Sequence, residues 1–171
     1  MKSDSSPVLG GKLGTCFDVA RLKEGDKFRL GFSWRPKASV ALTESPDGKA
    51  WMRVSDKPVL APEKPWEKVA LMCPHVIWDE AAREFCMWYS GGEQYEPDAI
   101  GCATSPDGKT WTKHAANPII RPGENQWDHD ACYKPFAIFD GGRWLLWYNG
   151  RRGNVEQIGL AIHEGEDLGF E

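Results

Sequence analysis

The segment Ser45-Pro-Asp-Gly-Lys-Ala-Trp51 returns as Ser105-Pro-Asp-Gly-Lys-Thr-Trp111, 60 residues further along the chain. In each copy Pro presets the first position of a tight turn, and Gly can adopt the positive φ that such turns often require. Each copy therefore predicts a turn that leads into a strand. A fixed period of this length is typical of repeat proteins. We conclude that the chain is built from copies of one unit.

The similarity of the copies extends beyond this motif and reveals a third copy. Three pairs of segments recur: Pro58-Val-Leu60 and Pro118-Ile-Ile120, Trp66-Glu67 and Trp127-Asp128, and Trp88-Tyr-Ser-Gly91 and Trp147-Tyr-Asn-Gly150. In the third copy His163–Phe170 replaces the Ser-Pro-Asp-Gly motif, and only Phe170 stands in for its tryptophan. The repeats are expected at about 7–57, 58–117 and 118–171.

Short runs of aromatic and branched residues alternate with Gly, Pro, Asp and Asn in every copy, which indicates many short strands. No segment has a sustained helical period. Each unit is therefore predicted to be a four-stranded antiparallel meander, and such units repeated around an axis are the blades of an all-β propeller. The expected strands are 19–22, 28–33, 40–44 and 51–54; 74–79, 85–90, 100–105 and 111–114; and 136–139, 144–149 and 158–163.

Composition limits the classes of function. The 171 residues include 41% hydrophobic and 27% charged side chains, which indicates a soluble globular protein. A net charge of -4 provides no basic field for nucleic acid, and no apolar run is long enough for a membrane helix. Without a signal-like first segment, a cytoplasmic location is expected. Five cysteines without a Cys-x-x-Cys pair, and an isolated His129, predict reduced thiols and no metal or cofactor.

The second copy resembles a known group of enzymes. Its segments Pro74–Asp79, Phe85–Gly92, Ile100–Trp111 and Asn117–Ile120 are similar to the five-bladed propellers of glycoside hydrolase families 43, 32 and 68 and of the family 130 mannoside phosphorylases. The resemblance extends from about Pro7 to Leu168. It implies a carbohydrate-related function, with catalytic carboxylates at the inner-strand entrances around an axial funnel.

Repeated residues are expected to serve the scaffold. Turn chemistry alone accounts for Asp47 and Asp107, and Trp51 and Trp111 are expected to pack between blades. Functional residues are sought where the copies differ. Trp34 is such a residue, because it stands where the other copies have Gly91 and Gly150.

Two carboxylates, Asp18 and Asp130, stand at inner-strand entrances, and glycoside hydrolysis uses a pair of carboxyl groups. In family 43 the base aspartate precedes a proline, whereas our alignment of the copies puts Asp18 in the column of Pro74. The resemblance places the acid where this chain has Met72 and, in the third copy, Tyr133. Glu93, in the loop after a second strand, is the alternative acid.

Cationic residues at the same end point to a second chemistry. Arg35 and Arg151 follow second strands, and His75 and Lys134 stand at inner-strand entrances. Together they could bind phosphate, as the phosphorolysis of family 130 requires. Trp34, Tyr133 and His75 could instead bind a sugar, with aromatic rings stacking on its apolar face.

Three functions are therefore considered. The preferred one is a sugar-binding or catalytically degenerate glycosidase-like propeller, because the acid column holds Met72. The alternatives are an active hydrolase or phosphorylase with a rearranged set of acids, and a protein-interaction scaffold. The expected partners are a carbohydrate or small glycoside and a second copy of the chain.

The homodimer is expected because three blades cannot close a ring, which usually has four to eight. Two three-blade arcs related by a two-fold axis would make a six-bladed ring. Residues Ser3–Leu9 resemble the stretch that follows an outermost strand, and are expected to complete the third blade of the partner.

Overall fold

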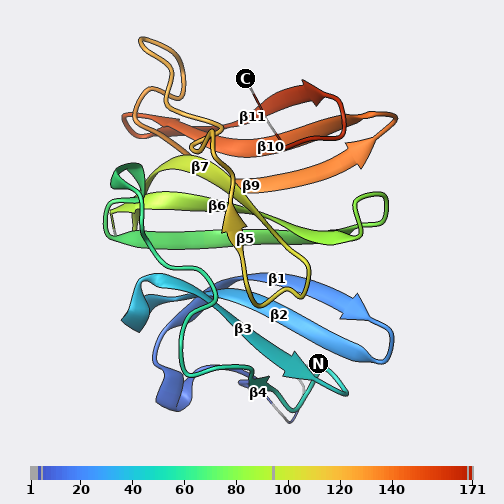
Figure 1. Ribbon diagram of the computed structural model, residues 1–171. Coiled ribbons are helices and arrows are strands. Elements are labelled where there is room, and N and C mark those ends of the chain that lie inside the picture. Colours follow the sequence, from blue (N-terminus) through green and yellow to red (C-terminus); the bar gives the residue numbers. More distant parts are fainter. Residues whose placement is uncertain (1–3, 5, 94, 169, 171) are drawn as a thin grey trace.

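The computed structural model describes residues 4, 6–93, 95–168 and 170. These residues form three antiparallel sheets stacked one on the next (Figure 1). The first sheet contains β1 (Cys16–Glu24), β2 (Lys27–Trp34), β3 (Ser39–Ser45) and β4 (Met52–Arg53), and the second contains β5 (Ala70–Asp79), β6 (Glu84–Glu93), β7 (Glu96–Ser105) and β8 (Thr112–Lys113). The third contains β9 (Ala131–Asp140), β10 (Arg143–Arg152) and β11 (Val155–Glu164).

Three 3-10 turns connect these strands: η1 (Gly11–Leu13), η2 (Arg35–Lys37) and η3 (Pro65–Glu67). Within the described residues, no helix has the length and apolar character needed to cross a membrane. The described residues therefore form an all-β protein, as the sequence predicts.

Every strand expected from the sequence is present, and the inner and middle strands are longer than expected. The third sheet has three strands within the described residues, one fewer than a four-stranded blade. The stretch Ser3–Leu9, expected to complete that blade in a partner, includes residues outside those that the structure describes. All five cysteines are free, as predicted.

The Ser-Pro-Asp-Gly turns are held by hydrogen bonds among their own residues. In the second sheet Asp107 Oδ1 accepts hydrogen bonds from the backbone N–H groups of Lys109 and Thr110, each at 2.8 Å, and Ser105 Oγ accepts from the N–H of Gly108 at 2.8 Å. The indole N–H of Trp111 donates to the carbonyl oxygen of Gly108 at 3.2 Å. The first sheet repeats these bonds, so both motifs are parts of the scaffold.

The recurring Trp66 and Trp127 lie against glycines of the middle and third strands. A Cβ added to Gly150 would lie 2.2 Å from a ring atom of Trp127, and one added to Gly91 would lie 2.7 Å from a ring atom of Trp66. Only glycine leaves room for these rings. The second and third sheets therefore have glycine in this column because a tryptophan ring covers it.

Trp34 occupies the glycine column in the first sheet and has a structural role, contrary to the sequence-based interpretation. Its ring is buried with Phe32 and Ala41, next to Leu13. Its indole N–H donates to the Leu13 carbonyl oxygen at 2.8 Å. The first sheet thus obtains from its own middle strand the aromatic ring that Trp66 and Trp127 supply to the other sheets from preceding loops.

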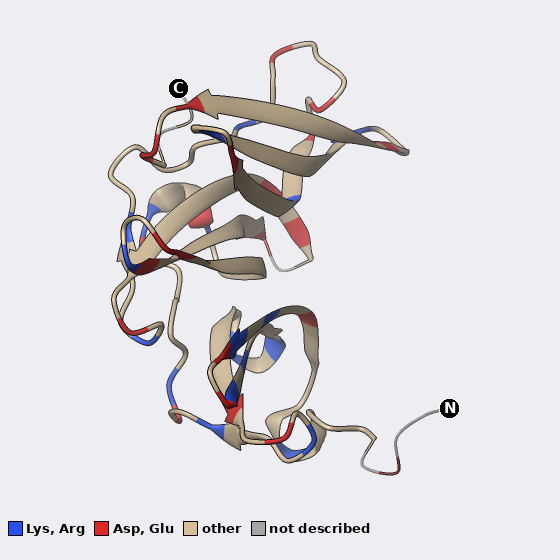
Figure 2. Ribbon diagram, turned by 90° about the vertical axis from the view of Figure 1, so that its right-hand side faces the viewer, with Lys and Arg blue, Asp and Glu red and all other residues tan. Residues whose placement is uncertain are grey.

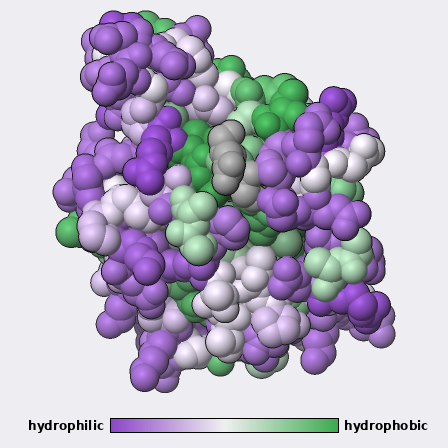
Figure 3. Space-filling view, turned by 45° about the horizontal axis from the view of Figure 1, so that its top comes forward, coloured by the Kyte–Doolittle hydropathy of each residue, from purple (hydrophilic) through white to green (hydrophobic). Residues whose placement is uncertain are grey.

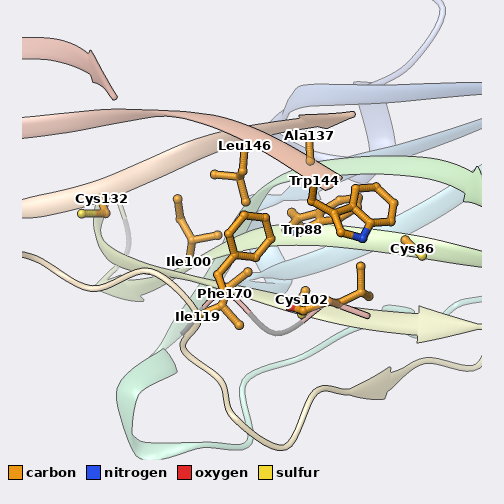
Figure 4. Close-up of a cluster of buried hydrophobic side chains, with 11 residues drawn as sticks. Cys86, Trp88, Ile100, Cys102, Ile119, Cys132, Ala137, Trp144, Leu146 and Phe170 are labelled. Carbon is orange, nitrogen blue, oxygen red and sulfur yellow. The ribbon is translucent and has the colours of Figure 1, made fainter. Parts of the chain in front are cut away.

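The core lies between consecutive sheets. Trp88 of the second sheet and Trp144 of the third are fully buried, with ring centroids 5.1 Å apart, and Phe170 closes the same cluster (Figure 4). A second cluster between the first two sheets contains Val76 and Met87. Face-to-face burial of apolar side chains therefore holds the stack together.

We expect Trp144→Ala to lower the free energy of unfolding by about 3–5 kcal/mol, the usual cost of removing a buried aromatic ring. Val69→Ala, at an exposed position, should change it by less than about 0.5 kcal/mol. Chemical unfolding of the two variants tests this. Equal effects would contradict the placement of the core between the second and third sheets.

The backbone N–H groups of Thr110 and Lys109 lower the pKa of Asp107 from 3.8 to about 2. Because the pKa in the folded state is the lower one, the ionised carboxylate stabilises the fold above about pH 4, and this contribution is lost as the pH falls toward about 2. Asp107→Asn should therefore be most destabilising near neutral pH, and its difference from the unsubstituted protein should shrink in acid. Unfolding measured across this pH range should show the convergence. A difference independent of pH would mean that the charge does not stabilise the turn.

Candidate functional site

The inner strand of each sheet, β1, β5 or β9, has one β-bulge near its start. The bulged residues are Asp18, Cys73 and Lys134, with φ angles of 48°, 54° and 52°. The backbone N–H of Cys73 donates to Ser33 Oγ at 2.9 Å, and that of Lys134 donates to Ser90 Oγ at 3.0 Å. A serine on the middle strand of one sheet therefore holds the bulge of the next sheet.

This register corrects the alignment of the copies. Asp18 stands in the column of Cys73 and Lys134, and not in that of Pro74. In the second and third copies this column immediately precedes proline. Asp18 is therefore at the position to which the resemblance assigns the catalytic base.

The bulges of the three sheets converge on one cleft with a volume of about 350 Å³. The bulges lie near the starts of β1, β5 and β9, so the cleft lies where these three inner strands begin. Its lining consists of Phe17, Asp18, Met72, Cys73, Tyr95, Glu96, Pro97, Ala131, Tyr133, Lys134, Arg151 and Glu156. In the view of Figure 2, basic and acidic residues are spread over the three sheets. The charged residues of the cleft are Asp18, Glu96, Lys134, Arg151 and Glu156.

Asp18 is the centre of the polar contacts in the cleft. Its Oδ2 accepts hydrogen bonds from the thiol of Cys73 at 3.2 Å and from the hydroxyl of Ser33 at 3.4 Å. The ammonium of Lys134 lies 4.0 Å from Oδ1. Burial, followed by the negative charge of Asp18, raises the pKa of the Cys73 thiol, so Cys73 stays protonated and acts as a donor.

A second group of polar residues comes from the third sheet and the β6–β7 hairpin. Arg151 Nη2 lies 3.0 Å from Glu96 Oε2, an ion pair that joins two sheets across the cleft. Burial, and then a hydrogen bond to Glu156, raise the pKa of Tyr133. The cleft thus combines carboxylates, cations and a phenol, the types of group that bind sugar hydroxyls or an anion.

Aromatic side chains form the remaining wall. The rings of Phe17 and Tyr95 are stacked with centroids 5.7 Å apart, and the guanidinium of Arg35 lies 4.3 Å from the centre of the Tyr95 ring. Arg35 therefore supports the rim of the cleft through Tyr95. It lies near the cleft without lining it.

The cleft contains no carboxylic acid in the column where the resemblance places one. Phe17, Met72 and Tyr133 pair with equivalent residues of their middle strands, so they occupy the same column of the three sheets. All three line the cleft. Met72, which the sequence analysis places in the acid column, therefore lies in the cleft.

Two predicted catalytic carboxylates do not line the cleft. Asp130 lies just before β9, where its Oδ2 accepts a hydrogen bond from the N–H of Gly153 at 2.6 Å and its Oδ1 lies 2.9 Å from His129 Nδ1. The hydrogen bond with His129 is the main reason that the pKa of Asp130 is lowered. Glu93 is exposed at the end of β6. In the same β6–β7 hairpin, Glu96 lines the cleft.

His75 also lies away from the cleft. Its ring is packed between sheets, 4.5 Å from the ring of Phe136, and its Nε2 lies 2.9 Å from the Ala137 carbonyl oxygen. Burial lowers the pKa of His75. Trp34 is buried in the first sheet as described above, which leaves Asp18, Tyr133, Lys134 and Arg151 as the predicted residues that line the cleft.

The sequence analysis missed Glu96, Glu156 and Cys73 as residues of the cleft. Glu156 follows the β10–β11 turn and pairs with Arg151, and Glu96 follows the β6–β7 turn. The β6–β7 and β10–β11 turns both lie near the inner-strand entrances, so charged residues just after these turns were candidates for the cleft. Identifying them from the sequence requires the exact position of each turn.

No protein-family model matches the sequence. Over 124 residues this chain is 29% identical to the uncharacterized protein Rv1502 of Mycobacterium tuberculosis, and the aligned region covers 69% of this chain and 39% of Rv1502. The structure of this chain is similar to that of Zg3597, a family 117 glycoside hydrolase of Zobellia galactanivorans (TM-score 0.69, 17% identity, 87% of this chain). It is also similar to that of the β-1,2-mannobiose phosphorylase of Listeria innocua (TM-score 0.67, 18% identity, 89% of this chain).

The chain spans 52% and 41% of the length of these two structures, respectively. At such identities the likeness shows a shared fold. The described chain therefore has the propeller-like fold of glycoside hydrolase families, and its sheets correspond to blades.

Asp18→Asn provides a test of the contacts in the cleft. Removing the charge beside Cys73 should lower the pKa of that thiol and speed its alkylation by iodoacetamide several-fold at about pH 9, because the thiolate is the reacting form. Burial raises the pKa of Cys102 to about 12 with no contribution from Asp18, so Cys102 is the internal control. Peptide mass spectrometry can follow both cysteines. An unchanged rate at Cys73 would contradict its contact with Asp18.

Proposed function

We propose that this protein is a carbohydrate-binding relative of the propeller glycosidases whose catalytic set is incomplete. The observation that carries the proposal is the acid column: Phe17, Met72 and Tyr133 line the cleft, and none of them is a carboxylic acid. Asp18 occupies the base column of the same cleft. Glycoside hydrolysis needs a proton donor as well as a base or nucleophile, whereas sugar binding needs only hydrogen-bonding groups and an apolar surface.

The arrangement of the cleft suits a sugar. Asp18, Lys134 and Arg151 present charged hydrogen-bonding groups, and Tyr133 presents a hydroxyl next to its ring. The stacked rings of Phe17 and Tyr95 give an apolar wall on which a pyranose face can pack. A volume of about 350 Å³ accommodates one or two sugar rings.

Binding can be tested by calorimetric titration with a panel of mono- and disaccharides. We expect one class of sugar to bind saturably, and Asp18→Asn and Tyr133→Phe each to weaken that binding about tenfold, which corresponds to the loss of a hydrogen bond to a charged or buried group. Asp130→Asn is the matched control, because this exposed carboxylate does not line the cleft. Equal losses in all three variants, or no saturable binding by any sugar, would contradict the proposal and favour an interaction scaffold.

The second candidate is an enzyme with rearranged acids, and two observations favour testing it. Glu96 and Glu156 line the same cleft as Asp18, and Lys134 and Arg151 supply two cations that could bind inorganic phosphate. Release of nitrophenol from aryl glycosides, measured with and without phosphate, separates hydrolysis from phosphorolysis. Turnover that is lost in Asp18→Asn and in Glu96→Gln or Glu156→Gln would establish the enzyme and overturn the binding-only proposal.

A further inference from the structure

A groove opens between the first and second sheets, at the end of the stack opposite the cleft around Asp18. Its volume is about 430 Å³, and the β1–β2 and β5–β6 turns flank it. Both turns follow inner strands that begin at the cleft, so the two hollows lie at opposite ends of these strands (Figure 1). The residues that line the groove are all different from those that line the cleft. The groove is therefore a separate candidate site.

Apolar side chains form the inner wall of the groove. Cross-strand pairing puts Trp78 and Phe85 on the face of the second sheet that packs on the first, and Leu22 faces them from β1. The rings of Trp78 and Phe85 meet edge to face, with centroids 4.7 Å apart. Two exposed carboxylates, those of Glu24 and Glu80, stand at the rim. The half-buried ring of Trp78 is thus reached through a rim that is as hydrophilic as most of the surface in view in Figure 3.

The interface between the second and third sheets differs at the same end of the stack. In the third sheet Phe139 stands in the column of Trp78, by its register with the middle strand. Its ring contacts that of Trp144, with centroids 5.0 Å apart. The space beside Phe139 measures only about 110 Å³, and Glu166, from the segment after β11, lines it. The carbonyl oxygen of Glu166 accepts a hydrogen bond from the indole N–H of Trp144 at 3.2 Å. The packing of one sheet on the next therefore requires neither a tryptophan in this column nor an open groove.

Two polar groups of the groove make no hydrogen bond or ion pair within the described part of the chain: the indole N–H of Trp78 and the carboxylate of Glu80. Glu24 differs, because Arg29 Nε lies 3.2 Å from its Oε2 and holds it in place. The charge of Glu80 is opposed by that of Lys23, which also lines the groove. The groove thus combines a donor, two acceptors and an aromatic ring, with charges that balance once Arg29 is counted. Such a set of groups suits a neutral, polar ligand.

We propose that this groove is a second carbohydrate site, which binds a neutral sugar residue at the end of the stack away from the cleft. The apolar face of a pyranose packs on the ring of Trp78, and a sugar oxygen accepts the indole N–H. Sugar hydroxyls donate to the carboxylates of Glu24 and Glu80. The volume of about 430 Å³ accommodates one or two sugar rings. Because the groove has its own residues, the site does not depend on the function proposed for the cleft.

Nuclear magnetic resonance of the 15N-labelled protein tests the site, with cellobiose, maltose, lactose and xylobiose as the probes. The indole N–H signal of Trp78 is identified by its loss in Trp78→Phe. With at least one probe this signal should shift saturably, with a Kd of about 1–10 mM, as expected for a small open site. The indole signal of Trp144 is the internal control, because its N–H is already bonded to Glu166. The shift of the Trp78 signal should be the same in Asp18→Asn, which alters only the cleft.

Substitutions in the groove identify the groups that bind. Glu80→Gln should weaken the binding about tenfold, the usual effect of losing a hydrogen bond to a charged group. Glu124→Gln is the matched control, an exposed carboxylate outside the groove. Trp78→Phe keeps a ring in the column, as the third sheet does with Phe139, so this variant should fold. The backbone amide of Gly25, which lines the groove, then reports the weaker binding that remains.

Three outcomes would overturn the second site. The first is a Trp78 signal that no probe shifts. The second is a shift that disappears in Asp18→Asn, since the sugar would then bind in the cleft and act on Trp78 from a distance. The third is equal binding by Glu80→Gln and Glu124→Gln. Loss of the groove site in any of these ways leaves the calorimetric test of the cleft unaffected, so the two proposals fail separately.

Discussion

Two hydrogen bonds between sheets position the candidate site: Ser33 accepts the N–H of Cys73, and Ser90 accepts the N–H of Lys134. Each bond stabilises a left-handed bulge that turns a side chain toward the common end of the stack. The bulge would otherwise be unfavourable, since a non-glycine residue with positive φ is strained. Because the serines belong to the preceding sheet, the geometry of the cleft depends on the packing of one sheet on the next. Scaffold and site are thus coupled at Cys73 and Lys134, and Asp18 of the first sheet shares their backbone conformation.

Much of the fold could be predicted because it depends on local and periodic signals. The turn motifs, the strands and the structural role of Trp66 and Trp127 follow from spacing and turn chemistry. The site was only partly predictable, for identifiable reasons. The alignment displaced Asp18 by one column because the first copy has Val19 where the other two have the proline that follows the bulge. Trp34 was misinterpreted because its ring takes the place of Trp66 and Trp127 of the other copies. Those two tryptophans lie in loops far from the Trp34 column in the sequence, so an alignment of the copies does not relate them to Trp34. The directions of His75 and Asp130 depend on neighbours in other segments, which a single sequence does not reveal.

At the cleft the three repeats share a backbone conformation and differ in their side chains. The bulged column contains an acid, a thiol and an ammonium, and the neighbouring column contains two aromatic residues and a methionine. The bonds that hold the bulges at Cys73 and Lys134 are made by the backbone N–H groups and not by the side chains of these columns. Chemical diversity is therefore concentrated where the blades are structurally equivalent. This is why the fold, which is shared with hydrolases and a phosphorylase, limits the function less than these few positions do.

The self-contained Ser-Pro-Asp-Gly turns also bear on how the chain reaches this structure. Their hydrogen bonds join residues no more than three positions apart, so the turns can form before any two sheets meet. Contacts of low sequence separation form rapidly, because little chain entropy is lost in closing a short loop. Each of the first two sheets therefore has a turn at its outer hairpin that can form early, whereas the sequence of the third copy lacks the Ser-Pro-Asp-Gly motif. The order of assembly should follow this asymmetry, with the third sheet becoming ordered as it packs on the finished surface of the second.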